Sequence, residues 1–128
     1  MKYLLDTHIF LWWNLGQGQL SERIIEIISN GNNEIFLSAA STWEITIKVA
    51  KKKLTIPEKP ESFIRSRMQL HAFQALAIQI HHATGVYNLP THHSDPFDRL
   101  LIAQSQIEAM PLLSADMNIR RYDLEVIW

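Results

Sequence analysis

The sequence reads DPFDRLLIAQSQI over residues 95–107, and this stretch has the pattern of a capped helix that faces a core. Asp95 followed by Pro96 is a typical helix start, because an acidic side chain can cap free backbone amides and proline fits the first helical position. Apolar side chains then recur at helical spacing, at Phe97, Leu100, Leu101, Ala103 and Ile107. The stretch therefore predicts a helix that packs one side against a core.

Outward from this helix, short apolar runs alternate with segments of helical pattern. The runs predict five strands, at residues 2–5, 34–37, 76–78, 111–114 and 124–127. The other segments predict helices at residues 21–29, from Ser38 or Ser41 as N-cap to about Lys52, at 61–71 and at 81–87. This alternation predicts an α/β fold, a three-layer α/β/α sandwich around a mostly parallel sheet. Right-handed crossovers would bring the C-terminal ends of the strands to one edge, where such sheets bind ligands.

Length and composition indicate one compact domain, which we expect to span residues 1–128. The hydrophobic share of 47% and the charged share of 20% are ordinary for a globular protein and exclude a disordered or fibrous chain. The chain has no cysteine, which excludes a disulfide framework and a thiolate metal site. No apolar run is long enough to span a bilayer, and Asp6 interrupts any signal-peptide core, so we expect a soluble, cytoplasmic protein without membrane contact.

The formal net charge of −1 does not mark a strong nucleic-acid binder by bulk electrostatics. Basic residues nevertheless form two clusters, at Lys48, Lys51, Lys52 and Lys53 and at Arg120 and Arg121. These clusters are equally consistent with solvated helix faces and with surfaces that attract phosphate groups.

Four acidic residues that are far apart in the sequence are predicted to lie at the same edge of the sheet. They are Asp6 after the first strand, Glu44 early in the helix after the second, Asp98 in the first turn of the helix at 95–107, and Asp116 after the fourth strand. Each also has an ordinary structural explanation: a turn at Asp6, an ion pair of Glu44 with Lys48, a capping box of Asp95 and Asp98, and a cap by Asp116 of residues 117–121.

Taken together, the four acids favour a metal site. Clustered carboxylates repel one another and raise one another's pKa values, and a divalent cation removes that penalty. Mg²⁺ and Mn²⁺ both prefer oxygen ligands, and either can activate water for attack at phosphorus. Carboxylates without a nucleophilic serine or cysteine therefore point to phosphodiester hydrolysis by metal-activated water.

Several motifs of the chain resemble those of the PIN-domain nucleases, specifically the VapC-like toxins of toxin–antitoxin pairs. The matching stretches are YLLDTH at 3–8, SAASTWEI at 38–45, HHSDPFDRLLIAQ at 92–104, PLLSAD at 111–116 and VIW at 126–128. They occur in the family's order and extend over essentially the whole chain, so together they are far more specific than any one of them.

The resemblance implies a metal-dependent endoribonuclease that cleaves RNA with Mg²⁺ or Mn²⁺ and acts as the toxin of a toxin–antitoxin pair. It implies that Asp6 and Asp98 are the principal metal ligands, and that Glu44 and Asp116 bind through water or position the attacking one. It also implies a cognate antitoxin and a homodimer as partners. Thr7 and Asp95 are secondary candidates, because Thr7 can instead bond to backbone and Asp95 can instead cap its helix. The alternative is a catalytically silent PIN fold that binds RNA or protein.

Two other groups of residues allow more than one interpretation. The consecutive apolar residues 9–13 are either a core helix with one partly exposed tryptophan or a helix that contacts another chain. The adjacent pairs His81-His82 and His92-His93 do not have zinc-ligand spacing, because neighbours in a helix or strand point in different directions. We expect His92 and His93 to lie at the rim of the pocket or to contact RNA.

Two enzyme classes that place aspartate after a strand are disfavoured. An aspartyl phosphatase needs a second acid two residues after the first, and His8 stands there. A receiver domain needs adjacent acids after its first strand and a lysine late in the chain, and neither is in place.

Overall fold

Five strands form a single sheet in the computed structural model of the chain, which describes residues 1–128. The strands are β1 (Lys2–Leu5), β2 (Glu34–Ser38), β3 (Gln74–Leu76), β4 (Leu112–Leu113) and β5 (Val126–Ile127). Their order across the sheet is β3-β2-β1-β4-β5, and every neighbouring pair is parallel. The expectation of a mostly parallel sheet is confirmed, and the sheet is in fact parallel throughout.

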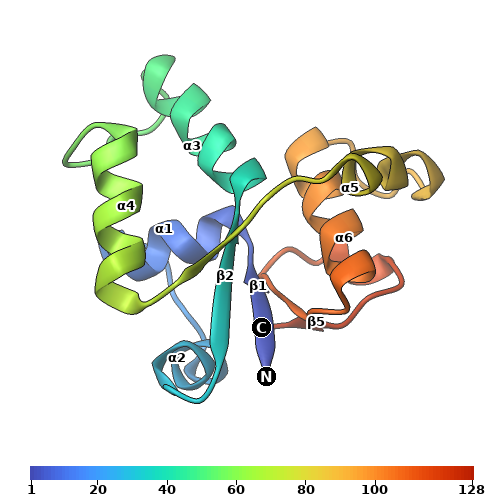
Figure 1. The fold of residues 1–128 in the computed structure, drawn as a ribbon, viewed down its shortest axis with the longest axis horizontal. Helices are drawn as coiled ribbons and strands as arrows, with labels where there is room; N and C mark the ends of the chain where they lie inside the picture. Colours follow the sequence, from blue (N-terminus) through green and yellow to red (C-terminus); the bar gives the residue numbers. More distant parts are fainter.

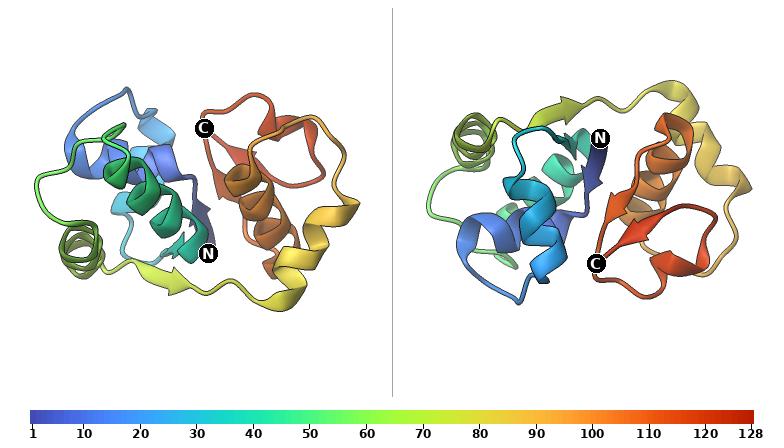
Figure 2. Two further views of the ribbon diagram at one scale, coloured as in Figure 1. Left: turned by 90° about the horizontal axis from the view of Figure 1, so that it is seen from above. Right: turned by 90° about the horizontal axis from the view of Figure 1, so that it is seen from below.

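Six helices surround the sheet. They are α1 (Thr7–Leu15), α2 (Glu22–Ser29), α3 (Ala39–Ala50), α4 (Pro60–His71), α5 (Ile80–Gly85) and α6 (Pro96–Glu108), with short 3-10 turns at η1 (Val86–Asn88) and η2 (Ile119–Arg121). Figure 1 shows α1, α2 and α4 on one side of β1 and β2, and α5 and α6 on the other. The predicted α/β/α layering is confirmed, and the views along the perpendicular direction in Figure 2 show the same separation.

The two faces of the sheet bury two separate apolar clusters. Because side chains alternate along a strand, Tyr3 and Leu5 of β1 enter the cluster under α1, α2 and α4, whereas Leu4 enters the one under α6. Both clusters are therefore built from the same short strands, which explains why these strands are apolar without interruption.

Helix α3 lies above the C-terminal edge of the sheet and belongs to both clusters. Ile45 packs with the first and Ala40 with the second. Of the two predicted N-caps, Ser38 is the actual one, because its hydroxyl accepts a hydrogen bond from the backbone N–H of Ala40. Ser41 lies inside the helix, so its assignment as a cap was wrong.

The apolar run at 9–13 forms α1 and is mainly a core helix. Its residues Ile9, Phe10 and Leu11 are buried. Trp12 and Trp13 are half-buried at its outer side, where they pack edge-on against Trp128 and His71 respectively. The first of the two interpretations offered for this run therefore describes it better, with two partly exposed tryptophans in place of one.

The chain leaves β1 and β4 toward opposite faces of the sheet. After β1 it enters α1 on one face, and after β4 it enters η2, whose Ile119 packs into the cluster on the other face. Two adjacent parallel strands with diverging connections leave a crevice at their C-terminal ends, which is the usual ligand site of open α/β sheets. Asp6 directly follows β1, and Asp116 lies in the loop that follows the C-terminal end of β4. Both residues therefore border this crevice.

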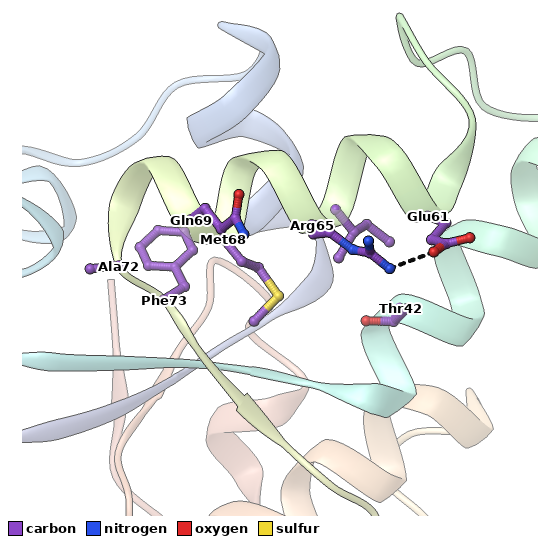
Figure 3. A pocket seen from close by; sticks show the side chains of 8 residues that line it. Thr42, Glu61, Arg65, Met68, Gln69, Ala72 and Phe73 are labelled. Carbon is purple, nitrogen blue, oxygen red and sulfur yellow. Dashed lines mark hydrogen bonds and ion pairs between the residues drawn. The ribbon is translucent and has the colours of Figure 1, made fainter.

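A separate cavity of about 540 Å³ lies between α3 and α4. Its lining includes Thr42 of α3 and the apolar side chains of Ile64, Met68 and Phe73, and it contains none of the four acids (Figure 3). None of the helices has the length and apolar character needed to cross a membrane.

Candidate metal centre

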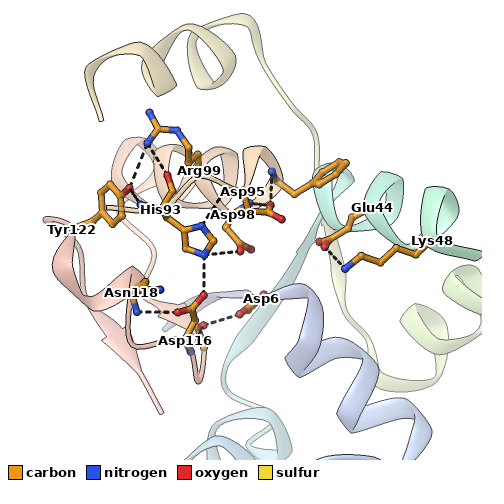
Figure 4. A network of polar contacts seen from close by, with 12 residues as sticks. Asp6, Glu44, Lys48, His93, Asp95, Asp98, Arg99, Asp116, Asn118 and Tyr122 are labelled. Atoms are coloured by element: carbon orange, nitrogen blue, oxygen red, sulfur yellow. Dashed lines mark hydrogen bonds and ion pairs between the residues drawn. The ribbon is translucent and has the colours of Figure 1, made fainter. Parts of the chain in front are cut away.

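The four acids come from four elements and converge at the C-terminal edge of the sheet (Figure 4). Asp6 follows β1, Glu44 lies on α3, Asp98 lies in the first turn of α6, and Asp116 follows β4. The tightest group is Asp98, Asp116 and His93, whose potential ligand atoms all lie within 4.8 Å of one another. Asp6 and Glu44 are outside that group, although their charges act on Asp98.

Asp6 is almost fully buried, with 3% of its surface exposed. Its Oδ2 accepts a hydrogen bond of 2.6 Å from the Ser114 hydroxyl on the neighbouring strand end, while its Oδ1 is buried without any partner. Burial raises the pKa of Asp6 above its ordinary value, and the Ser114 hydrogen bond opposes that rise only in part. One oxygen of this carboxylate is thus fixed and the other lacks a ligand.

Glu44 is also 3% exposed, so its pair with Lys48 is not the solvated surface pair that the spacing alone indicates. Lys48 Nζ lies 2.8 Å from Glu44 Oε2, and Oε1 is buried without a partner. Burial by itself would lower the pKa of Lys48, but the hydrogen bond that Lys48 donates to Glu44 and the negative charges of Glu44, Asp95 and Asp98 raise it. Lys48 is therefore a cation held at the edge of the acidic cluster.

Asp98 is a second acid of the cluster with a raised pKa. Burial raises the pKa of Asp98 to about 7, with further increases from the negative charges of Asp6, Asp95 and Glu44, against a lowering by His93. A carboxylate that resists ionisation for these reasons becomes fully charged when a cation enters the same space.

His93 lies between two of the acids. Its Nε2 is 2.9 Å from Asp116 Oδ2 and 3.0 Å from Asp98 Oδ2. The backbone N–H of Asp95 donates to Nδ1, so that nitrogen carries no proton and the ring proton lies on Nε2, directed at the carboxylates. His93 thus lies inside the cluster and not at its rim, and the alternative that it contacts RNA stays a prediction.

A group of polar contacts holds the segment that carries His93. The Arg99 guanidinium donates to the carbonyls of Pro90 and Val86, and the Tyr122 hydroxyl donates to Pro90 and accepts from the His93 backbone N–H. Figure 4 shows Arg99 and Tyr122 beside His93 on the side away from Glu44. His93 is therefore held both through its ring and through its backbone.

The secondary candidates have structural partners. Asp95 caps α6, since its Oδ1 accepts hydrogen bonds from the backbone N–H groups of Phe97 and Asp98. The reciprocal half of the expected capping box is absent, because the Asp95 backbone N–H donates to His93 and not to Asp98. Thr7 donates its hydroxyl proton to the buried Ser41 hydroxyl, 2.8 Å away.

Asp116 has a structural partner at each of its carboxylate oxygens. Its Oδ1 accepts a hydrogen bond of 2.8 Å from the Asn118 backbone N–H, which starts the turn leading to η2. Its Oδ2 contacts His93, and its backbone N–H donates to the Ser114 hydroxyl that also holds Asp6. A depression of about 280 Å³ next to it is lined by Asp6, His8, Trp12, Ala115 and Asp116.

The pair His81-His82 is closer to a ligand geometry than its spacing indicated. The two ring centroids are 4.6 Å apart, and both rings lie near the Glu108 carboxylate. However, His82 Nδ1 accepts the Gln79 backbone N–H, so Nε2 carries the proton that it shares with Glu108 Oε2 at 2.7 Å. A protonated Nε2 cannot ligate a metal, and the geometry is that of a buried histidine with two satisfied nitrogens.

The residues around the acidic cluster fit a divalent cation. Two buried carboxylate oxygens, Asp6 Oδ1 and Glu44 Oε1, have no hydrogen-bond partner, and such orphaned charges are costly unless something pairs with them. The donors available are oxygens, with no cysteine in the chain, which matches Mg²⁺ or Mn²⁺ more closely than Zn²⁺.

Two residues that matter for this geometry are not evident as site residues from the sequence. Ser114 and Arg99 act through contacts that join segments far apart in the chain, and no local pattern marks them. His93 had a signal, because it stands two residues before the N-cap of α6, but its direction depends on the loop conformation.

Comparison with known proteins gives one family and several related structures. A family model described as "PIN domain" matches residues 3–125. Among curated proteins, no match was found.

The fold is similar to those of several solved structures. VapBC2 from Rickettsia felis, bound to a DNA fragment from its promoter, has a TM-score of 0.70 at 18% identity and covers 100% of this chain and 99% of that chain. FitAcB from Neisseria gonorrhoeae has a TM-score of 0.66 at 19% identity, with coverage of 100% and 97%. A toxin–antitoxin complex from Klebsiella pneumoniae has a TM-score of 0.64 at 19% identity, with coverage of 98% and 96%. At these identities the likeness concerns the fold.

Proposed function

The chain belongs to the PIN domain family, and from this premise we propose that it is a metal-dependent endoribonuclease, the toxin of a toxin–antitoxin pair. The observation that carries the proposal is the pair of buried, unpartnered carboxylate oxygens on Asp6 and Glu44, beside an Asp98 whose pKa is raised to about 7. Such an arrangement costs free energy in a fold without a cation, and a bound cation would offset that cost.

Asp6, Glu44 and Asp98 would hold a Mg²⁺ or Mn²⁺ ion. Asp116 would act next to them, because both of its oxygens already have partners in Asn118 and His93. When bound, the ion supplies an activated water and charge stabilisation for hydrolysis of a phosphodiester.

The chain's own residues provide the remaining functions. Lys48 is 40% exposed at its side chain and can exchange its contact with Glu44 for one with a substrate phosphate. His93 keeps Asp98 and Asp116 at fixed separation through its Nε2. Ser114 prevents rotation of Asp6 by bonding to its Oδ2, so that Oδ1 stays directed away from the bond.

RNA cleavage tests this proposal directly. Purified protein should cleave single-stranded RNA with Mn²⁺ or Mg²⁺ and not with chelator, and Asp6→Asn and Asp98→Asn should each reduce the rate by at least about 100-fold. Asp123→Asn, at an exposed acid remote from the cluster, is the matched control and should cleave as the wild type does. A wild type that binds Mn²⁺ but cleaves no RNA would instead favour a catalytically silent binding module.

We further propose that a cognate antitoxin is a partner of the chain, since one of the similar structures is described as a toxin–antitoxin complex, and that the chain also forms a homodimer. Expression of the chain alone should arrest growth of a bacterial host, and the Asp98→Asn variant should not. Growth arrest that persists in that variant would separate toxicity from the acidic cluster.

A further inference from the structure

One aromatic side chain next to the acidic cluster has no role in the core. Trp43 precedes Glu44 on α3 and is 58% exposed, whereas the other tryptophans, Trp12, Trp13 and Trp128, pack against the first apolar cluster. An indole combines a large apolar ring with a polar N–H group, and tryptophan is enriched at binding surfaces for this reason.

Trp43 is fixed in relation to the acids by a second aromatic residue. Its ring is edge-to-face with that of Phe97, with centroids 5.3 Å apart and an interplanar angle of 79°. Phe97 immediately precedes Asp98 on α6. The aromatic pair thus joins the two helices that carry Glu44 and Asp98, at the ends where those acids lie.

A positive charge that can contact a phosphate group lies on the same helix as Trp43. Lys48 is one turn beyond Glu44 on α3 and lies within the field of Asp95 and Asp98, where it can contact a phosphate bound at the cation site. The base of a nucleotide whose phosphate binds at the acids lies beside that phosphate, and Trp43 is the exposed aromatic residue next to Glu44 in the sequence and packed on the neighbour of Asp98.

We propose that Trp43 stacks on an unpaired base of the RNA next to the scissile phosphate, so that the substrate must be single-stranded there. The proposal rests on the nuclease function proposed above. Aromatic stacking recognises bases only when they are free of a duplex, because paired bases expose no face. Phe97 holds the indole in place, and Trp43 provides a specificity element that the metal site lacks.

An RNA base fits the site better than a protein side chain. The exposed aromatic surface here is a single ring packed on Phe97, and the two helices that carry this pair also carry the charged groups of Glu44, Lys48 and Asp98. A protein partner would need a broader apolar area than a single indole to bind stably.

RNA binding by Trp43 variants tests the proposal. All proteins carry Asp98→Asn to prevent cleavage, and the probe is a fluorescein-labelled short RNA of mixed sequence, presented as a single strand, as a duplex, or as a strand with abasic sugars. Trp43→Ala should weaken single-strand binding roughly 5- to 150-fold, Trp43→Phe should restore most of it, and Trp43→Leu should not. With abasic RNA the variants should bind equally.

Two controls complete the experiment. Tyr87→Ala removes an aromatic ring that is 87% exposed on η1, which carries none of the acids, and should leave RNA affinity unchanged. In the native Asp98 background, Trp43→Ala should bind Mn²⁺ as the wild type does, which shows that the fold and the acidic cluster are intact.

Each adverse outcome has a distinct meaning. Unchanged RNA affinity in Trp43→Ala, or an equal loss on abasic and normal RNA, would overturn the stacking proposal alone and leave Trp43 as a contact for a protein partner. Absence of RNA binding by the Asp98→Asn parent together with absence of RNA cleavage by the wild type would overturn this proposal and the nuclease function, whereas cleavage of single-stranded RNA by Trp43→Ala at the wild-type rate would overturn this proposal alone.

Discussion

At the scale of single residues, the carboxyl group of Asp98 lowers the free energy of unfolding of the metal-free protein at neutral pH. Its pKa rises from 3.8 to about 7 on folding, so the native state holds a proton between these values that the unfolded chain releases. The contribution of Asp98 to the free energy of unfolding is therefore fully present below about pH 4 and is lost as the pH rises toward 7. The loss has an upper limit of about 4 kcal/mol, from the size of the shift.

We predict that Asp98→Asn stabilises the protein when a chelator keeps it free of metal. The gain in the free energy of unfolding should be larger at about pH 8 than at about pH 5. The asparagine keeps the side chain's shape and an oxygen for His93 but has no charge for Asp6, Asp95 and Glu44 to repel. Urea unfolding at both pH values, in chelator, measures the difference. Asp123→Asn is the control for loss of an exposed acid, and equal stability of Asp98→Asn and wild type at about pH 8 would contradict the clustering.

Ser114 provides a second prediction at this scale. Its hydroxyl donates to Asp6 Oδ2 and accepts from the Asp116 backbone N–H, so it sets the position of two acids. Ser114→Ala should lower Mn²⁺ affinity about 10- to 100-fold, as loss of a group that orients a ligand commonly does. Calorimetric titration with Mn²⁺ measures this.

The matched control for Ser114 is another buried serine. Ser105 donates to the Met110 carbonyl at the far end of α6, away from the acids. Ser105→Ala should cost about 1 kcal/mol of stability and leave Mn²⁺ affinity unchanged. If both serine variants weaken metal binding equally, the effect of Ser114 is general destabilisation and not positioning of Asp6.

At the scale of elements, the local patterns were sufficient to place most helices and strands. The acid–proline start at residues 95–96 and the apolar repeat after it define α6 almost to the residue, because capping and burial are both local signals. The sequence pattern was less reliable at α3, because Ser38 and Ser41 are both possible N-caps. Ser38 accepts the capping hydrogen bond, whereas Ser41 accepts a hydrogen bond from the distant Thr7, which the local sequence does not indicate.

The site was partly predictable by the same reasoning. Asp6, Glu44, Asp98 and Asp116 were placed at the correct edge because each follows a strand or begins a helix. The role of His93 was not, because its ring direction depends on Arg99 and Tyr122, which reach it from α6 and from beyond η2. Contacts that join distant segments leave no trace in local periodicity.

The N-cap of α6 gives a prediction about an element. Asp95→Ala removes two hydrogen bonds at the start of the helix and should destabilise the protein by about 1 kcal/mol, within the 0.5–2 kcal/mol typical of caps. Asp95→Asn retains the cap and should retain both stability and Mn²⁺ affinity. A large loss of Mn²⁺ affinity in Asp95→Asn, measured by calorimetry, would show that Asp95 is a metal ligand as well as a cap.

At the scale of the whole molecule, the acidic cluster brings together residues from elements on opposite faces of the sheet. Asp6 belongs to the strand end that leads to α1 on one face, and Asp98 belongs to α6 on the other. Glu44 comes from α3, which packs with both clusters. The repulsion among these acids therefore acts between the two layers of helices, and a cation at their centre connects those layers.

This arrangement predicts that a divalent cation stabilises the whole fold and not only its site. Mn²⁺ at about 100 times its dissociation constant should add about 2.7 kcal/mol, which raises the Tm of a chain of this size by on the order of 10 °C. Differential scanning calorimetry with Mn²⁺ and with chelator measures the shift. In Asp98→Asn the shift should largely disappear, while in Glu125→Gln, at an exposed acid before β5, it should equal that of the wild type. A shift of equal size in Asp98→Asn would mean that the ion binds elsewhere on the surface, because only a ligand held between the layers by Asp6, Glu44 and Asp98 loses its effect when one of these charges is removed.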